Sequence, residues 1–69
     1  MSTITFRLNG KPAQATTGDT VADLLVQQRI DPSHVVVEIN RTIVNREQYG
    51  TTVINREDVI EVLRFVGGG

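Results

Sequence analysis

The sequence predicts a single α+β domain, with a mixed sheet of four to five strands and one main helix packed on one face. Ten valines, six isoleucines and eight threonines favour strands, because branched side chains fit a pleated surface. Only one segment places apolar residues at helical spacing. A length of 69 residues allows one small core. Together these observations indicate a sheet that a single helix covers.

The chain begins with a predicted hairpin. Apolar and polar residues alternate over residues 4–8, as in a strand with one buried face. Asn9 and Gly10 then accept the positive φ angles of a two-residue turn. Residues 11–16 return antiparallel, and Pro12 places this second strand at an edge because proline cannot donate to a ladder.

The predicted helix covers about ten residues, from the Thr20 cap to Arg29. Its apolar face consists of Val21, Leu24 and Leu25. Thr20 and Asp23 have the spacing of a capping box, and we expect Asp31 and Pro32 to end the helix. A helix this short is unstable alone, so its apolar face must lie against the sheet.

The remaining elements are an interior strand (35–40), a short strand (43–44), a helical turn (45–50) with Tyr49 folded inward, a polar turn (55–58) and a final strand (59–66). The order is therefore β-β-α-β-β-β. A right-handed crossover lets the first and last strands lie parallel in the centre of the sheet. This is the ubiquitin-like β-grasp layout, with a domain over residues 1–66 and a flexible glycine tail at 67–69.

Composition excludes several kinds of function. Cysteine is absent, which removes disulfides, thiolate metal sites and cysteine nucleophiles. The net charge of −1 is spread without blocks, so we expect neither nucleic-acid nor membrane binding. The N-terminal residues do not have the pattern of a signal peptide, and no apolar stretch is long enough to span a membrane. We therefore expect a soluble, cytoplasmic protein.

The side chains offer no recognisable catalytic set and no metal site. His34 is the single histidine and is expected to be a solvated loop residue. The carboxylates Glu47, Glu57, Asp58 and Glu61 are spaced as polar turn and strand residues, and we expect most of them to be solvated. The chain is thus predicted not to be an enzyme by itself and to bind no cofactor.

The reactive group that remains is the α-carboxylate of Gly69. Half of the six glycines stand at Gly67, Gly68 and Gly69, which gives a thin arm that could enter the active site of another protein. Three extended residues span about 10 Å. The alternative is an ordinary frayed end. If the tail is functional, its carboxylate needs activation, for example by adenylation with ATP.

Ordering such a tail costs about 1–2 kcal/mol per residue, so the folded domain must contribute binding contacts. Both faces of the last predicted strand carry apolar residues. Leu63 and Phe65 are the candidates for a docking patch if they are exposed, and they belong to the core if a loop covers them.

These residues together resemble the sulfur carrier proteins of thiamin biosynthesis. The resemblance covers the whole length and is carried by residues 40–49, 58–62 and 65–69. Two positions depart from the family pattern: Asn45 stands at the usual proline, and Glu57 stands where glycine commonly precedes the aspartate. Both are in turns, so they put local turn geometry in doubt more than function.

The resemblance implies a cycle of activation and sulfur transfer. An E1-like adenylating enzyme, using ATP and magnesium, would activate Gly69, and a sulfur donor system would replace AMP to give a thiocarboxylate. A thiazole synthase would then receive the sulfur for the thiazole ring. Gly69 would be the modified residue, with Gly68 and Gly67 extending the arm, and the partners would supply every catalytic group.

Three other functions stay open at this point. One is a sulfur carrier for molybdopterin synthesis, which uses the same chemistry. The motif at residues 40–49 favours the carriers of thiamin biosynthesis over this alternative. Another is a ubiquitin-like modifier joined to lysines, because an adenylate is the common intermediate. The last is a β-grasp binding module whose glycine end has no chemical role.

Overall fold

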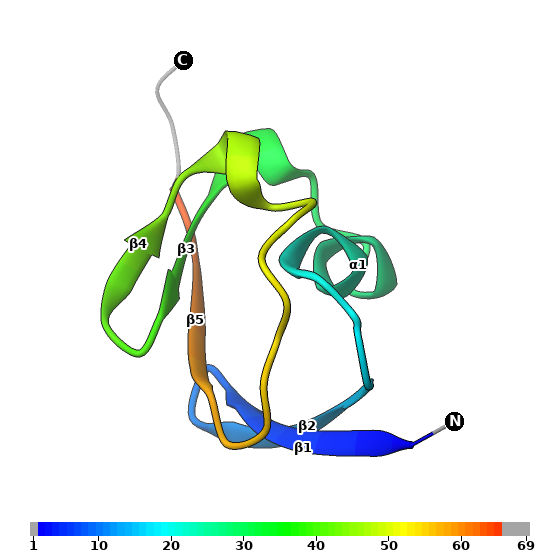
Figure 1. Ribbon diagram of the computed structural model, residues 1–69. Coiled ribbons are helices and arrows are strands. Elements are labelled where there is room, and N and C mark those ends of the chain that lie inside the picture. Colours follow the sequence, from blue (N-terminus) through cyan, green and yellow to red (C-terminus); the bar gives the residue numbers. More distant parts are fainter. Residues whose placement is uncertain (1, 66–69) are drawn as a thin grey trace.

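The computed structural model describes residues 2–65 of the chain. Its elements are β1 (Thr3–Leu8), β2 (Lys11–Thr16), α1 (Val21–Gln27), the single-turn helix η1 (Pro32–His34), β3 (Val35–Ile39), β4 (Thr42–Val44), the single-turn helix η2 (Arg46–Gln48) and β5 (Val59–Arg64). Figure 1 shows these elements in one layer of sheet that curls around α1.

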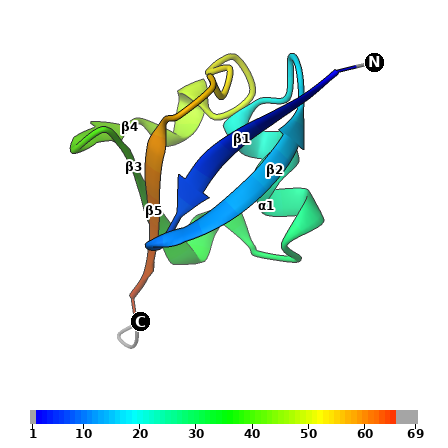
Figure 2. The ribbon, with the colours of Figure 1, turned by 90° about the horizontal axis from the view of Figure 1, so that it is seen from below.

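Within residues 2–65 the sheet has five strands in the order β2-β1-β5-β3-β4. β5 runs parallel to β1 and antiparallel to β3, and the other neighbouring pairs are antiparallel. The last strand therefore lies in the centre, as Figure 2 shows from below. The predicted ubiquitin-like fold, with one main helix on one face of a mixed sheet, is confirmed.

Two tight turns connect the hairpins. Asn9 and Gly10 have φ angles of 51° and 83°, as the sequence predicted, and Asn40 and Arg41 have φ angles of 52° and 71°. Positive φ at both central residues matches the right-handed twist of the flanking strands. The β2 strand is at the edge of the sheet, where Pro12 was expected.

The predicted start of α1 is confirmed in detail. The side-chain oxygen of Thr20 accepts a hydrogen bond from the Asp23 backbone N–H at 3.2 Å. The Asp23 carboxylate in turn accepts one from the Thr20 backbone N–H at 2.9 Å. These two bonds satisfy donors that the first turn of a helix leaves free.

The predicted end of α1 at Arg29 was wrong, because the last helical residue is Gln27. Arg29 has a φ of 59°, so it leaves the helix in the left-handed conformation. Its backbone N–H donates to the Val26 carbonyl at 3.0 Å, and that of Ile30 donates to the Leu25 carbonyl at 2.9 Å. This Schellman pattern ends the helix before the Asp-Pro pair is reached.

The core lies on the concave side of the sheet, between the strands and α1 (Figure 1). Its buried members are Ile4, Phe6, Ala15, Val21, Leu24, Leu25, Val35, Val37, Tyr49, Ile54 and Ile60. Tyr49 is buried as expected, directly after η2. The segment 49–54 is tied to the start of α1, because the Ala22 and Val21 backbone N–H groups donate to carbonyls in it.

The β5 strand is shorter than predicted and ends at Arg64. Its antiparallel neighbour β3 begins at Val35, which pairs with Arg64, so the ladder has no further partner residues. The Phe65 backbone N–H still donates to the His34 carbonyl at 3.2 Å. Val66, predicted as the last strand residue, lies outside the described residues.

Candidate functional site

The predicted reactive end, Gly67, Gly68 and Gly69, lies outside the described residues. The described part of the site is β5, which leads directly to it, together with the surface that surrounds the end of this strand. β5 has hydrogen-bonded neighbours on both sides. The chain therefore approaches its predicted tail from a central strand, which pairs with β1 at its start and with β3 up to Arg64.

Two turn asparagines add bonds to the β5 backbone. The side-chain oxygen of Asn9 accepts a hydrogen bond from the Val62 N–H at 2.8 Å. That of Asn40 accepts one from the Val59 N–H at 3.0 Å. Each asparagine follows a strand that borders β5, so its side chain continues the ladder beyond the end of that strand. The positive φ of the turns and the polar side chains thus act together to fix β5.

Asp58 holds the start of β5 and is the exception to the expectation that most of these carboxylates are solvated. Asp58 is buried. One of its oxygens accepts from the Asn40 side-chain NH₂ at 3.0 Å, and the other from the Asn55 backbone N–H at 2.8 Å. The three-residue spacing from Asn55 was a signal for this contact, whereas Asn40 is distant in sequence. Glu47, Glu57 and Glu61 are exposed as expected.

Leu63 and Phe65 are both exposed, with 46% and 53% of their surface accessible. They are not core residues, so the structure leaves them free for the docking role that the sequence suggested. Leu63 pairs with Val36 across β5 and β3 on the outer face of the sheet, which α1 does not cover. Phe65 follows the end of β5 and precedes the predicted tail.

Further apolar residues were missed by sequence reasoning. Ile43 is 62% exposed and lies on β4 opposite Glu38, so it shares the outer face. Val36 is half-buried on the same face. We call the surface made by Val36, Ile43, Leu63 and Phe65 the outer patch. The signal was the alternation in β3, where Glu38 marks which residues of that strand point away from the core.

His34 is exposed, as predicted, at the end of η1. Its Nδ1 lies 4.0 Å from a carboxylate oxygen of Asp31. The backbone N–H and the hydroxyl of Ser33 donate to Asp31, and these bonds lower the pKa of that carboxyl. The arrangement is a turn cap with its carboxylate already engaged. Across residues 2–65, no three His, Cys, Asp or Glu side chains are grouped so that they could hold a metal ion.

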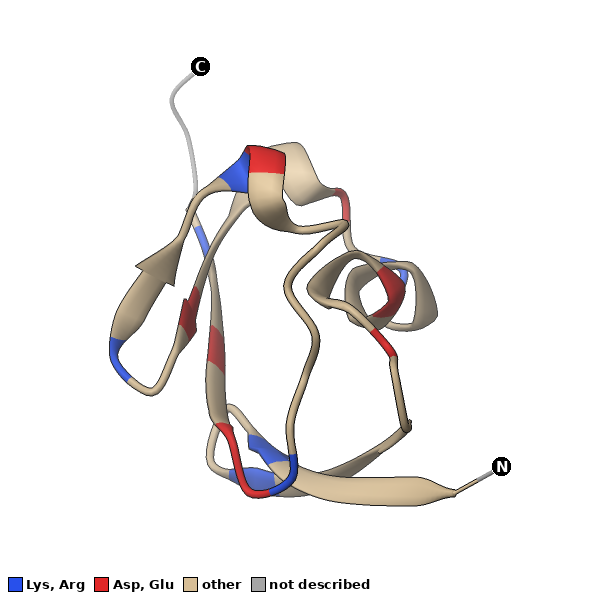
Figure 3. Cartoon of the chain, in the orientation of Figure 1, with Lys and Arg blue, Asp and Glu red and all other residues tan. Residues whose placement is uncertain are grey.

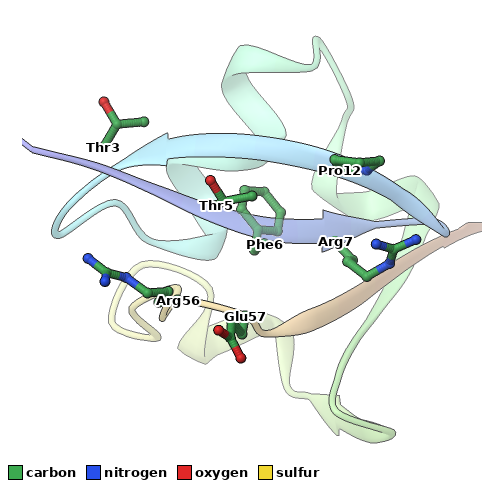
Figure 4. A pocket seen from close by; sticks show the side chains of 7 residues that line it. All are labelled: Thr3, Thr5, Phe6, Arg7, Pro12, Arg56 and Glu57. Carbon is green, nitrogen blue, oxygen red and sulfur yellow. The ribbon is translucent and has the colours of Figure 1, made fainter.

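A shallow groove of about 620 Å³ lies beside β1 and β2 (Figure 4). It is lined by Thr3, Thr5, Phe6, Arg7, Pro12, Arg56 and Glu57. The guanidinium groups of Arg7 and Arg56 lie at opposite sides of it and do not converge on one point. The groove borders the turn before β5, whereas the predicted tail follows the other end of that strand, about 20 Å away for six residues. It therefore lies at the opposite end of β5 from the last described residues.

Comparison with known protein families shows which family this chain belongs to. The model of the ThiS family matches residues 6–69, which is nearly the whole chain. The chain belongs to the ThiS family. The resemblance found in the sequence is thereby confirmed.

The proteins that are similar to this chain differ in length. The sulfur carrier protein ThiS of Bacillus subtilis is 40% identical over 66 residues, covering 93% of this chain and 98% of the relative. A thiazole synthase of Magnetococcus marinus is 44% identical over 64 residues, covering 93% of this chain but 20% of the relative. The chain thus spans a fifth of that thiazole synthase.

The fold agrees with a solved structure from the ThiS family. The crystal structure of a thiamine biosynthesis protein (ThiS) from Geobacter metallireducens matches with a TM-score of 0.83 and 30% identity. The match covers 96% of this chain and 100% of that chain. No helix within residues 2–65 has the length and hydropathy needed to cross a membrane.

Proposed function

We propose that this chain is a sulfur carrier protein of thiamin biosynthesis, and that the Gly69 carboxylate is the group that carries sulfur. The observation that supports this most directly is the match to the ThiS family, which extends through the glycine end to residue 69. The near full-length similarity to a sulfur carrier protein and the matching fold point the same way.

In the proposed cycle, a carboxylate oxygen of Gly69 attacks the α-phosphorus of ATP, and pyrophosphate leaves. The resulting acyl-adenylate has a good leaving group, so a sulfur donor can displace AMP and leave a thiocarboxylate. An E1-like enzyme with its magnesium provides the catalysis. The chain itself acts as a cosubstrate, binding no cofactor, and provides an accessible end without bulky side chains.

The fold supports this role through the position of β5. The strand is bonded on both sides, and Asn9, Asn40 and Asp58 fix its backbone. Because this strand is already fixed, a partner has to order only the last few residues of the chain. Because each ordered residue costs about 1–2 kcal/mol, a short arm on a rigid base needs less docking energy than a long loop would.

We further propose two enzymes as partners. Thiazole synthase is supported by the relative in which the matching segment makes up a fifth of a thiazole synthase. The E1-like adenylating enzyme follows from the chemistry that an inert carboxylate requires. Leu63 and Phe65 are the proposed docking residues, since both are exposed beside the approach to the tail. The cytoplasmic location expected from the sequence stays a prediction.

Intact-mass measurement tests the proposal. We expect the chain, after incubation with the adenylating enzyme, ATP and a sulfur source, to gain the mass difference of one sulfur replacing one oxygen. Deletion of Gly69 should abolish this gain, while circular dichroism and the melting temperature change little because the tail follows the last strand. Modification that persists without Gly69 would contradict the assignment.

The same experiment separates the alternatives. A thiocarboxylate that thiazole synthase consumes supports thiamin biosynthesis, whereas one that only molybdopterin synthesis consumes would support the other carrier. A chain linked to protein lysines would indicate a modifier. An unchanged mass with every enzyme combination would favour a plain binding module.

A further inference from the structure

Two glutamates stand directly opposite each other in the centre of the outer face. Glu38 of β3 pairs with Glu61 of β5 in the antiparallel register. Directly opposed residues have Cβ atoms about 4.5–5.5 Å apart, and like charges in such a pair destabilise a sheet. In Figure 3 both strands carry an acidic segment, drawn in red. Neither carboxylate forms an ion pair with another residue of the range 2–65.

Apolar residues border this acidic pair. Ile43 is opposite Glu38 on β4, and Val36 and Leu63 form the next pair on the same face, one step nearer the predicted tail. A protein that covers these apolar groups also removes water from the two carboxylates. Burying an unpaired charge is costly, so the covering surface must supply a cation.

An arginine fits this requirement best. Its planar guanidinium has five N–H donors and can bond two carboxylates at once, and it stays charged when water is removed. A second copy of the chain that docks through the same face does not fit, because it would bring four carboxylates together. The face therefore selects a partner that presents an arginine among apolar side chains.

We propose that the pair Glu38 and Glu61 receives an arginine of thiazole synthase when that enzyme holds the tail. This inference rests on the proposed function, which names thiazole synthase as a partner. The outer patch continues along β5 toward the tail, which indicates an enzyme that binds the tail. Thiazole synthase is favoured among such enzymes because a similar segment shares one polypeptide with it in a relative. A surface beside the tail is covered by whichever enzyme binds the tail.

The test measures the affinity of the full chain for thiazole synthase by isothermal titration calorimetry at low and high salt. We expect the double substitution Glu38→Gln and Glu61→Gln to weaken binding at least about tenfold at low salt, since truncating one side of a buried charge pair has effects of this size or larger. The salt dependence should also decrease. The double substitution Glu47→Gln and Glu57→Gln, which also removes two charges but from exposed positions that are not part of the outer patch, is the charge-matched control and should stay within about twofold of the unsubstituted chain.

Folding provides an independent check. Because the substitutions relieve a repulsion, the double variant should melt at the same temperature as the unsubstituted chain or higher, so lost affinity cannot be attributed to unfolding. Unchanged affinity, or equal losses in the charge-matched Glu47→Gln and Glu57→Gln control, would overturn the inference. So would intact binding to thiazole synthase combined with lost adenylation, because the adenylating enzyme would then be the occupant.

Failure of this inference can be distinguished from failure of the proposed function. Thiocarboxylate formation on the unsubstituted chain, with glutamine variants that bind thiazole synthase normally, would reject the arginine contact and leave the carrier function standing. The absence of thiocarboxylate, with affinity that still depends on the glutamates, would reject the function and keep the docking site.

Discussion

Five residues other than glycine in the described part of the chain have positive φ angles: Asn9, Arg29, Asn40, Arg41 and Glu57. The two asparagines use this conformation to bring their side chains onto β5. Glu57 has a φ of 68°. Within residues 2–65 its side chain forms no hydrogen bond that would offset the cost of this conformation. It is also the position where the family pattern commonly has glycine, so the sequence had already marked this turn as unusual. The left-handed conformation explains why glycine suits it.

Replacing Glu57 by glycine is therefore expected to stabilise the protein by about 1 kcal/mol, since a Cβ in the left-handed region costs about that much. For a domain of this size the melting temperature should rise by about 4–8 °C. The Glu57 backbone N–H bond to the Thr5 carbonyl, 2.9 Å long, should survive the change. Glu57→Ala is the control because it removes the carboxylate and keeps the Cβ. Equal stabilisation by alanine would show that charge, and not backbone conformation, is responsible.

At the scale of elements, local chemistry made much of the fold predictable. The Asn-Gly turn, the Thr20 cap and the edge position of Pro12 each depend on residues close in sequence, and all were recognised. The end of α1 was not, because it depends on Arg29 entering a conformation that arginine adopts rarely. The burial of Asp58 was also missed. Its partner Asn40 is 18 positions away, and only the assembled sheet brings the two together.

Asp58 is accordingly a structural residue of β5. Asp58→Ala should lower the free energy of unfolding by about 2–3 kcal/mol, because it leaves the Asn55 N–H and the Asn40 side chain without their charged acceptor. Chemical denaturation measures this loss. The exposed Glu47→Ala serves as the comparison and should change stability by less than about 0.5 kcal/mol. Similar small losses for both variants would mean that water replaces the carboxylate and that Asp58 does not anchor the strand.

For the whole molecule, the position of α1 decides which face of the sheet remains for partners. One helix covers the concave side of a five-stranded sheet, and the other side keeps exposed apolar residues around two glutamates. The sequence predicted Leu63 and Phe65 because they belong to one strand with apolar residues on both faces. Val36 and Ile43 could not be assigned in the same way, since their neighbourhood to Leu63 depends on the order of β5, β3 and β4 in the sheet. Residues 67–69 lie outside the described residues. The role proposed for them rests on the family match and on the chemistry of the Gly69 carboxylate.

The division between core and docking surface leads to a prediction for Phe65. Because this side chain is 53% exposed, Phe65→Ala should leave the melting temperature nearly unchanged and weaken the affinity for thiazole synthase about tenfold, the loss expected for an aromatic residue central to an interface. Ile60→Ala, at a fully buried position of the same strand, provides the contrast: it should cost about 2–5 kcal/mol of stability. Calorimetric titration and thermal melting on the same samples separate the two effects. A Phe65→Ala variant that melts early but binds normally would place Phe65 in the core and remove it from the docking surface.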